Sequence, residues 1–194
     1  MFTGIVECLG KVTRIGKGPR RSVSLIEVRG PAVARGARIG ASVAVNGVCL
    51  TVIKNRGPRL AFHVMTETKR RSTLGELSQG SLVNLERPLK YRGRIEGHFV
   101  LGHVDGMGCV RKIQKGKRQS SFLIQAPARL RHYLIEKGSI AIDGVSLTIG
   151  KVRKSSFWVH CIPHTLRATT FGSLKEGSKV NLEADILIKF FEGL

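Results

Sequence analysis

Short apolar runs alternate along the chain with turns rich in glycine, proline and asparagine, a pattern typical of β structure. Residues 22–28 and 59–65 show it well, since apolar side chains dominate both runs and turn residues bound them. No apolar run is long enough to predict a membrane-spanning helix. We therefore expect an all-β protein, with strands over residues 6–15, 22–28, 42–53, 59–65, 81–86, 108–113, 120–126, 139–152, 156–162 and 178–183.

Helical segments are few in this pattern. Pro31 and Pro127 each mark the start of a short predicted helix, and the second of these, PARLRHYLIEKG, ends at a glycine. The final segment, DILIKFFEGL, predicts a terminal helix that begins at Asp185.

The chain also contains an internal repeat. GASVAVNGVCLTV at residues 40–52 returns as KGSIAIDGVSLTI at residues 137–149, an offset of 97 residues (137 − 40). Three further blocks keep this register to within one residue: 65–75 with 162–172, 81–86 with 178–183, and 4–12 with 102–110. Two domain-sized copies, residues 1–97 and 98–194, therefore fill the chain, and about six strands in each favour a closed antiparallel barrel.

The formal net charge of +20 raises the possibility of a nucleic-acid partner. Its distribution argues against one, because the basic residues are spread in small groups, such as residues 20–21, 69–71 and 111–112, most of which fall in predicted loops. Aromatic residues make up only 6% of the chain, so stacking platforms for bases are scarce. We expect a solvated basic surface, which could also attract an acidic protein partner.

The cysteines are four, widely spaced and without a C-x-x-C pair, so the sequence predicts neither a zinc site nor a disulfide framework. His98 and His103 are five positions apart in the segment EGHFVLGHVDG, which we expect to be a further strand. That spacing would place them on opposite faces, so we predict no metal site. The first residues lack the basic and apolar regions of a signal peptide. We expect a soluble, cytoplasmic protein with no membrane attachment.

Candidate chemistry lies in the segments that recur. Cys49 and Thr51 share one face of a predicted strand, as do Ser146 and Thr148 in the second copy. Such small polar residues occur in ordinary β cores, and duplication alone could have kept them. Their recurrence beside a turn at Asn46 or Asp143 favours the wall of a pocket.

A second recurring block supplies further polar candidates in expected extended segments. It pairs His63 with His160, Glu67 with His164 and Thr68 with Thr165. The two copies are nevertheless unequal, since the second carries Asp143, Ser146 and Asp185 where the first carries Asn46, Cys49 and Pro88. We therefore expect both copies to bind the same ligand, with the carboxylates of one copy available for proton transfer.

Five segments, MFTGIVE, NGVCLTV, GHFVLGHVDG, IDGVSLTIG and IPHTLRATTFG, resemble the signature segments of the riboflavin synthase family, and the resemblance covers essentially the whole chain. It implies a homotrimer of subunits with two six-stranded Greek-key β-barrels and a short C-terminal helix. The implied active site lies between the first barrel of one subunit and the second barrel of its neighbour. The implied reaction is a four-carbon transfer between two molecules of 6,7-dimethyl-8-ribityllumazine. It yields riboflavin and a 5-amino-6-ribitylamino-pyrimidinedione, the last step of riboflavin biosynthesis, without cofactor or metal.

The resemblance also implies site residues, carried over by position. The first pocket would comprise Gly4, Ile5, Val6, Cys49, Leu50, Thr51, His63, Val64, Met65, Thr66, Glu67 and Thr68. The second would comprise Gly102, His103, Val104, Ser146, Leu147, Thr148, His160, Cys161, Ile162, Pro163, His164 and Thr165, with Lys137 reaching across the subunit boundary. The positions that the family associates with catalysis are Phe2, Cys49, His103, Ser146, Thr148 and Asp185.

Two alternatives to the enzyme have distinct signatures. A non-catalytic carrier of lumazine or flavin would be expected to lose the polar set in one copy, whereas Ser146, Thr148, Asp143 and Asp185 are all present. A nucleic-acid-binding barrel rests on the charge alone. The enzyme is the function that the sequence favours.

Overall fold

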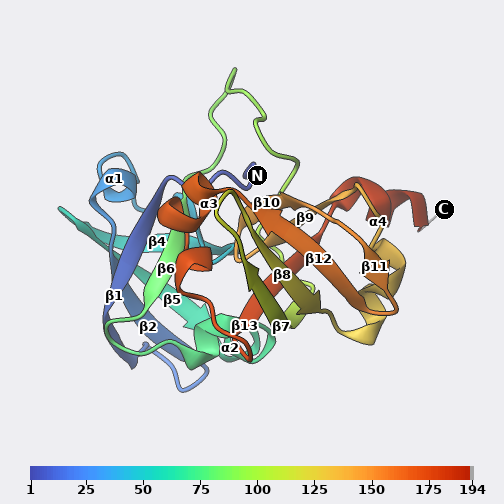
Figure 1. Ribbon diagram of the computed structural model, residues 1–194. Coiled ribbons are helices and arrows are strands. Elements are labelled where there is room, and N and C mark those ends of the chain that lie inside the picture. Colours follow the sequence, from blue (N-terminus) through green and yellow to red (C-terminus); the bar gives the residue numbers. More distant parts are fainter. Residues whose placement is uncertain (193–194) are drawn as a thin grey trace.

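The structure is a computed structural model that describes residues 1–192. Two β-barrels lie side by side, the first coloured blue to green and the second olive to red in Figure 1. Their strands are connected by short helical turns, and a long segment, residues 87–105, links them. The predicted domain boundary between residues 97 and 98 falls inside this linking segment.

The first barrel is closed by six antiparallel strands in the order β1-β2-β5-β4-β3-β6. Since β2 pairs with β5, and β3 with β6, the connections cross in the Greek-key manner. Its strands are β1 (Cys8–Lys17), β2 (Val23–Arg29), β3 (Ser42–Val45), β4 (Val48–Arg56), β5 (Arg59–Met65) and β6 (Leu82–Glu86). Its helical turns are α1 (Pro31–Ala34), α2 (Thr66–Arg71) and the 3₁₀ turn η1 (Thr73–Glu76).

The second barrel repeats this plan in the order β10-β9-β13-β7-β8-β12-β11. The counterpart of β4 is interrupted into β10 and β11, and hydrogen bonds from Gly150 to Trp158 and from Trp158 to Lys151 close the barrel between them. Its strands are β7 (Gly106–Lys115), β8 (Ser120–Gln125), β9 (Ser139–Ile142), β10 (Val145–Thr148), β11 (Val152–Arg153), β12 (Ser156–Cys161) and β13 (Lys179–Ala184). Its helical turns are η2 (Ala128–Tyr133), α3 (Pro163–Ala168), η3 (Thr170–Ser173) and the terminal α4 (Ile186–Glu192).

The prediction of two six-stranded antiparallel barrels is confirmed. Each barrel encloses its own apolar core, with Phe62 and Leu85 in the core of the first and Phe157 and Leu182 in that of the second. A third, smaller cluster of Phe2, Ala44, Val100 and Ala141 packs apart from both cores. The predicted terminal helix is present as α4, although residues 193–194 lie outside the described residues.

Two tight hairpin turns meet where the barrels touch. Asn46-Gly47 and Asp143-Gly144 both adopt the left-handed conformation that a two-residue hairpin loop requires. A Cβ atom on Gly47 would lie 2.6 Å from the backbone nitrogen of Gly144, so the two turns approach as closely as glycine allows. The side-chain amides of Asn84 and Asn181 cross the boundary and donate to the carbonyls of Asp143 and Asn46, at 2.8 Å each.

The structure corrects three local expectations. Residues 66–68 and 163–165 were expected to be extended, but they lie in α2 and α3. Proline at the first position of α3 fits that helix start, and Glu67 near the start and basic residues near the end of α2 complement its dipole. The segment from His98 to His103 is not a strand, apart from one bridge at Val100, and only His98 of the two histidines is buried. The helix expected after Pro127 is a 3₁₀ turn.

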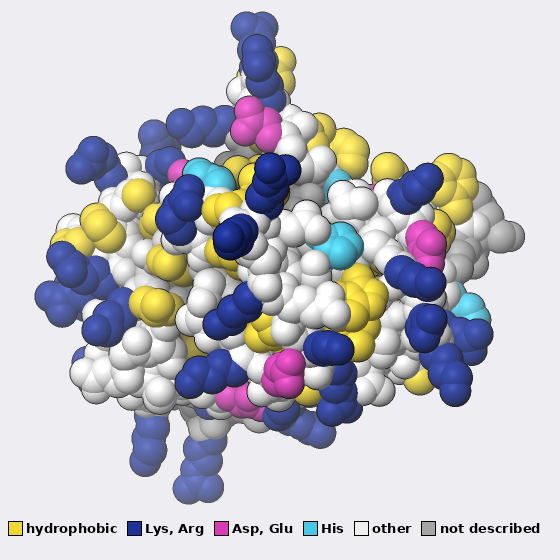
Figure 2. All heavy atoms as spheres, in the orientation of Figure 1, with side chains coloured by type: hydrophobic (Ala, Val, Ile, Leu, Met, Phe, Trp, Pro, Cys, Tyr) yellow, Lys and Arg dark blue, Asp and Glu magenta, His cyan; other side chains and the backbone are white. Residues whose placement is uncertain are grey.

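Basic side chains are scattered over the face of the molecule shown in Figure 2, with no single stripe of Lys and Arg on that face. This distribution agrees with a generally solvated basic surface. In the part of the chain that the structure describes, no helix has the length and apolar character needed to cross a membrane.

Candidate functional site

Two irregular segments cross from one barrel to the other. We call residues 3–6 the N-terminal strap and residues 101–104 the central strap. The carbonyl of Gly4 accepts a hydrogen bond of 2.8 Å from the amide of Ser146, and the carbonyl of Gly102 accepts one of 2.9 Å from the amide of Cys49. We call β4 and β10, the strands that follow the two hairpin turns, the hairpin strands. The strap of each copy therefore lies on the hairpin strand of the other copy.

The glycine in each strap is required by both conformation and space. Gly4 and Gly102 have φ angles of 78° and 80°, in the left-handed region. A Cβ atom there would come within 2.6 Å of the Cβ of Ser146 or of Cys49, respectively. The strap and the hairpin strand thus approach more closely than any residue other than glycine would permit at positions 4 and 102.

This crossing corrects the predicted composition of the two pockets. Gly4 and Val6 were assigned to the first pocket, but Gly4 lies on Ser146 and Val6 packs against the core of the second barrel. Conversely, Val104 packs against the core of the first barrel. The exchange of straps depends on tertiary contacts that an alignment of the two copies does not contain.

The first site is a cavity of about 210 Å³ on the outer face of the first barrel. It brings together predicted residues from three parts of the sequence: Cys49, Glu67, Thr68, Gly102, His103 and Val104. Arg71 and Ser72 also line it and were missed. Their signal was available, since both lie within the repeated block 65–75. Arg71 donates to Glu67 across one turn of α2.

The second site is centred on Ser146, whose hydroxyl lies 2.7 Å from Nδ1 of His98. His98 is only 8% exposed, and its Nε2 has no hydrogen-bond partner within the described structure. Burial lowers the pKa of this imidazole, and the charge of Asp185 opposes that shift in part. A neutral imidazole beside a hydroxyl can accept a proton, so His98 adds an acid–base group. From the sequence, His98 was considered only as a metal ligand, and that role was rejected.

Asp185 and Asp143 have different surroundings from those expected. The carboxylate of Asp185 accepts a hydrogen bond of 3.0 Å from the amide of Leu187 at the start of α4, while its charge acts on His98. Asp143 is 3% exposed and accepts from the amide of Asn181 in the hairpin contact between the barrels. Asp143 is therefore held in that contact, which corrects its expected availability for proton transfer.

Several predicted site residues direct their side chains into the apolar interior. Leu50 and Val64 belong to the core of the first barrel, and Cys161 and partly buried Leu147 to that of the second. Burial raises the pKa of the Cys161 thiol to about 12, so this thiol stays protonated. Phe2 is fully buried in the small third cluster, against which Cys49 packs. The buried side chains can shape the sites, but they leave mainly backbone available to a ligand.

The remaining predicted residues lie at or near the outer surface. Alternation along β4 and β10 leaves Thr51 and Thr148 exposed on the same faces as Cys49 and Ser146, as predicted. His160 is exposed and within 2.8 Å of the Ser121 hydroxyl. Those that are exposed or half-buried without a side-chain hydrogen bond to a neighbouring element are Ile5, His63, Met65, Lys137, Ile162, Pro163, His164 and Thr165. Thr66 is also exposed and donates to the carbonyl of Ser22.

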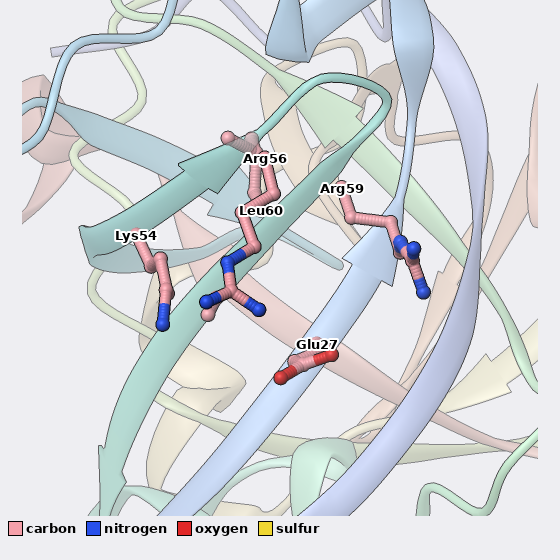
Figure 3. A pocket seen from close by; sticks show the side chains of 6 residues that line it. Glu27, Lys54, Arg56, Arg59 and Leu60 are labelled. Carbon is pink, nitrogen blue, oxygen red and sulfur yellow. The ribbon is translucent and has the colours of Figure 1, made fainter.

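Another cavity lies away from both straps, on the outer face of β2, β4 and β5. Figure 3 shows Lys54, Arg56 and Arg59 around Glu27. Leu60 and Ala61 also line this cavity. It shares no residue with the two sites described above. Within residues 1–192, no cluster of three or more His, Cys, Asp or Glu side chains could hold a metal ion.

The duplicated barrel and the two crossed straps define a small-molecule-binding protein with paired, similar sites. The chain belongs to the lumazine-binding domain family, since the family model described as "Lumazine binding domain" matches it twice, at residues 3–88 and 101–185.

Curated relatives specify the family further. The chain is 43% identical to riboflavin synthase of Actinobacillus pleuropneumoniae over 99% of its length and 88% of that protein. It is 42% identical to riboflavin synthase of Escherichia coli, over 95% of its length and 87% of that protein. The predicted resemblance to the riboflavin synthases is confirmed. Among solved structures, the chain is similar to LumP complexed with 6,7-dimethyl-8-(1'-D-ribityl) lumazine, with a TM-score of 0.85 and 25% identity over 95% of this chain and 99% of that one.

Proposed function

We propose that this chain catalyses the riboflavin synthase reaction at two unequal lumazine sites. One molecule of 6,7-dimethyl-8-ribityllumazine gives up a four-carbon unit to a second, and the products are riboflavin and the pyrimidinedione. The observation that carries this proposal is that the two sites are built alike but hold different polar side chains. Each site is built from a strap and the strand that follows a hairpin turn, but one site holds Cys49 where the other holds Ser146 with a buried histidine.

This arrangement suits a reaction between two identical molecules. Similar frames can bind the same heterocycle and polyol, and holding two reactants in a fixed orientation removes much of the entropic barrier. The chemistry also needs removal of a proton from the acidic methyl group of one lumazine. The neutral imidazole of His98, beside the hydroxyl of Ser146, is placed to accept or relay a proton in the second site.

We further propose a homotrimer in which the first barrel of one subunit faces the second barrel of its neighbour. Both sites lie on outer faces of the barrels, so one chain supplies one wall and leaves the other open to solvent. A neighbouring subunit would complete the enclosure, exclude water and bring the two lumazines face to face. Lys137, exposed in the second barrel, would reach across that boundary.

Within this proposal, Cys49, His103, Ser146 and Thr148 face the substrates directly. Phe2 supports Cys49 from behind through its packing, and Asp185 acts through His98. No metal or cofactor is required for these steps. A cytoplasmic location without membrane attachment, and an acidic protein partner for the basic surface, are further predictions.

The deciding experiment is to incubate the purified chain with 6,7-dimethyl-8-ribityllumazine and to monitor the appearance of riboflavin by its absorbance. Turnover at micromolar enzyme supports the proposal. Tight lumazine binding without riboflavin would refute it and favour a non-catalytic carrier of lumazine. Salt-sensitive binding to DNA without lumazine binding would favour a nucleic-acid function.

A further inference from the structure

The last strand of each barrel ends in a buried glutamate that lies directly beneath a strap. Glu86 closes β6 and is 5% exposed, and Glu183 lies near the end of β13 and is 4% exposed. They occupy equivalent positions in the repeat (183 − 86 = 97). Neither was among the candidates from the sequence, because a glutamate at the end of a strand carries no signal of its own.

Both carboxylates are occupied by the backbone of a strap. Glu86 accepts hydrogen bonds from the amides of Thr3, at 2.7 Å, and Gly4, at 3.2 Å. Glu183 accepts from the amides of Leu101, at 2.6 Å, and Gly102, at 2.9 Å. With both oxygens of each carboxylate engaged in charge-assisted hydrogen bonds, these groups are suited to holding a segment in place.

Each strap is therefore held from two sides. Its amides are bound by a glutamate of one barrel, and its glycine carbonyl is bound by a strand amide of the other barrel. For the central strap these partners are Glu183 of the second barrel and Cys49 of the first. For the N-terminal strap they are Glu86 of the first barrel and Ser146 of the second.

We propose that Glu86 and Glu183 are positioning residues that act crosswise: Glu183 sets the first-barrel site, and Glu86 sets the second-barrel site. Through the central strap, Glu183 fixes His103 beside Cys49. Through the N-terminal strap, Glu86 fixes Gly4 on Ser146, and the carbonyl of Thr3 in turn accepts a hydrogen bond of 3.1 Å from the amide of His98. The inference deepens the proposed function, on which its catalytic consequences rest.

The energetics favour a local effect. In Glu183→Gln the side chain keeps its size, but one of the two acceptors becomes an NH₂ donor that faces a backbone N–H. Loss of a buried hydrogen bond to a charged group corresponds to a change of about 10- to 100-fold in an equilibrium constant. Burial raises the pKa of Glu183 to about 7, so the comparison belongs at pH 8, where the carboxylate is ionised. The strap should then detach from its strand more often in the variant, while the barrel underneath stays folded.

Hydrogen exchange at two backbone amides measures this directly, because the amides of Cys49 and Ser146 are each covered by one strap carbonyl. In Glu183→Gln we expect exchange at the Cys49 amide to accelerate about 10- to 100-fold, with the Ser146 amide unchanged. In Glu86→Gln we expect the reverse. Glu176→Gln is the matched control, since Glu176 accepts a backbone amide, that of Ile113, away from both straps.

Activity and binding give a second, independent readout. Each of the two variants should lower kcat, because the reaction needs both sites, while titration with riboflavin should show one weakened and one unchanged binding step. Glu183→Asp and Glu86→Asp keep both acceptor oxygens, so each should have a higher kcat than the Gln variant at the same position. If a Gln variant does not fold, the Asp variant of the same position carries the exchange test.

The crossed exchange pattern is decisive. Acceleration at both amides in either variant, or acceleration only at the amide on the glutamate's own barrel, would overturn the inference. Hydrogen exchange needs no turnover, so failure of the chain to make riboflavin would refute the proposed function and leave the strap measurement valid.

Discussion

Asp143 is a carboxylate buried at the contact between the barrels, and it makes the stability of this protein depend on pH. Burial raises the pKa of Asp143 to about 7 from its ordinary value of 3.8, an effect that the hydrogen bond from the Asn181 amide reduces only in part. The folded protein therefore holds a proton between about pH 4 and pH 7 that the unfolded chain releases. The resulting stabilisation is complete below about pH 4 and is lost as the pH rises to about 7.

The first copy of the repeat shows how to remove this dependence. The φ angle of Asn46 is 47° and that of Asp143 is 46°. The Oδ1 atom of Asn46 accepts a hydrogen bond of 2.8 Å from the amide of Asn84, and the Oδ1 atom of Asp143 accepts one of 2.8 Å from the amide of Asn181. Asp143→Asn thus keeps the turn and the acceptor and deletes the titration. A shift of about 3 pKa units corresponds to roughly 4 kcal/mol at neutral pH.

We expect the variant to exceed the parent protein in free energy of unfolding by an amount that grows with pH. The difference should rise by about 1.4 kcal/mol per pH unit between about pH 4 and pH 7 and then level off. Urea denaturation of both proteins at pH 5, 6, 7 and 8 measures it, since all other titrating groups are common to both. The converse change, Asn46→Asp, should destabilise the protein at pH 7 and much less at pH 5. A difference that does not vary with pH, or a variant less stable than the parent at pH 8, would refute this account.

Three further predictions concern single side chains. Phe2→Ala removes a fully buried ring from the small cluster against which Cys49 packs. It should lower the free energy of unfolding, measured by urea denaturation, by about 3–5 kcal/mol. A loss below about 1 kcal/mol would contradict the packing role of Phe2. Cys161 is fully buried, and the pKa of its thiol is raised to about 12. It should therefore be the last cysteine that iodoacetamide alkylates at pH 8. If peptide mapping finds Cys161 modified before half-buried Cys49, the second barrel is open in solution. Asp185→Asn should impair turnover more than lumazine binding, because Asp185 acts through His98; equal kcat in the variant and the parent would rule out that role.

The repeat in the sequence was sufficient to predict the architecture. Alternation between buried and exposed positions, as in Cys49 and Thr51 on β4, was interpreted correctly because a strand's period of two is a local property. The Asn46-Gly47 turn is equally local, since only a few residues tolerate its left-handed backbone. For the same reason the predicted strands are close to the observed ones.

The site was predicted only in part, because its geometry depends on contacts between distant segments. Of the twelve residues named for the first pocket, only Cys49, Glu67 and Thr68 line the first cavity, and the assignment of straps to barrels was wrong. Alignment of the copies suggests that Gly4 belongs with Cys49, whereas in three dimensions it lies on Ser146. His98 and Glu183 were missed because burial and hydrogen-bond partners, and not residue type, give them their chemistry.

The inequality of the two sites originates in the different chain segments that leave the last strand of each barrel. After β6 the chain continues through Pro88 into the linking segment, which returns to the second site and places His98 beside Ser146. After β13 the equivalent position is Asp185, which caps α4 and directs the chain into a helix. Within the described residues, Cys49 therefore has no histidine equivalent to His98, and its site relies on His103 from the central strap. A duplicated barrel alone would give two equal binding sites. The different continuations at positions 88 and 185 place a buried histidine beside Ser146 in one of them. Within the proposed function, substitutions there should therefore change catalysis more than binding.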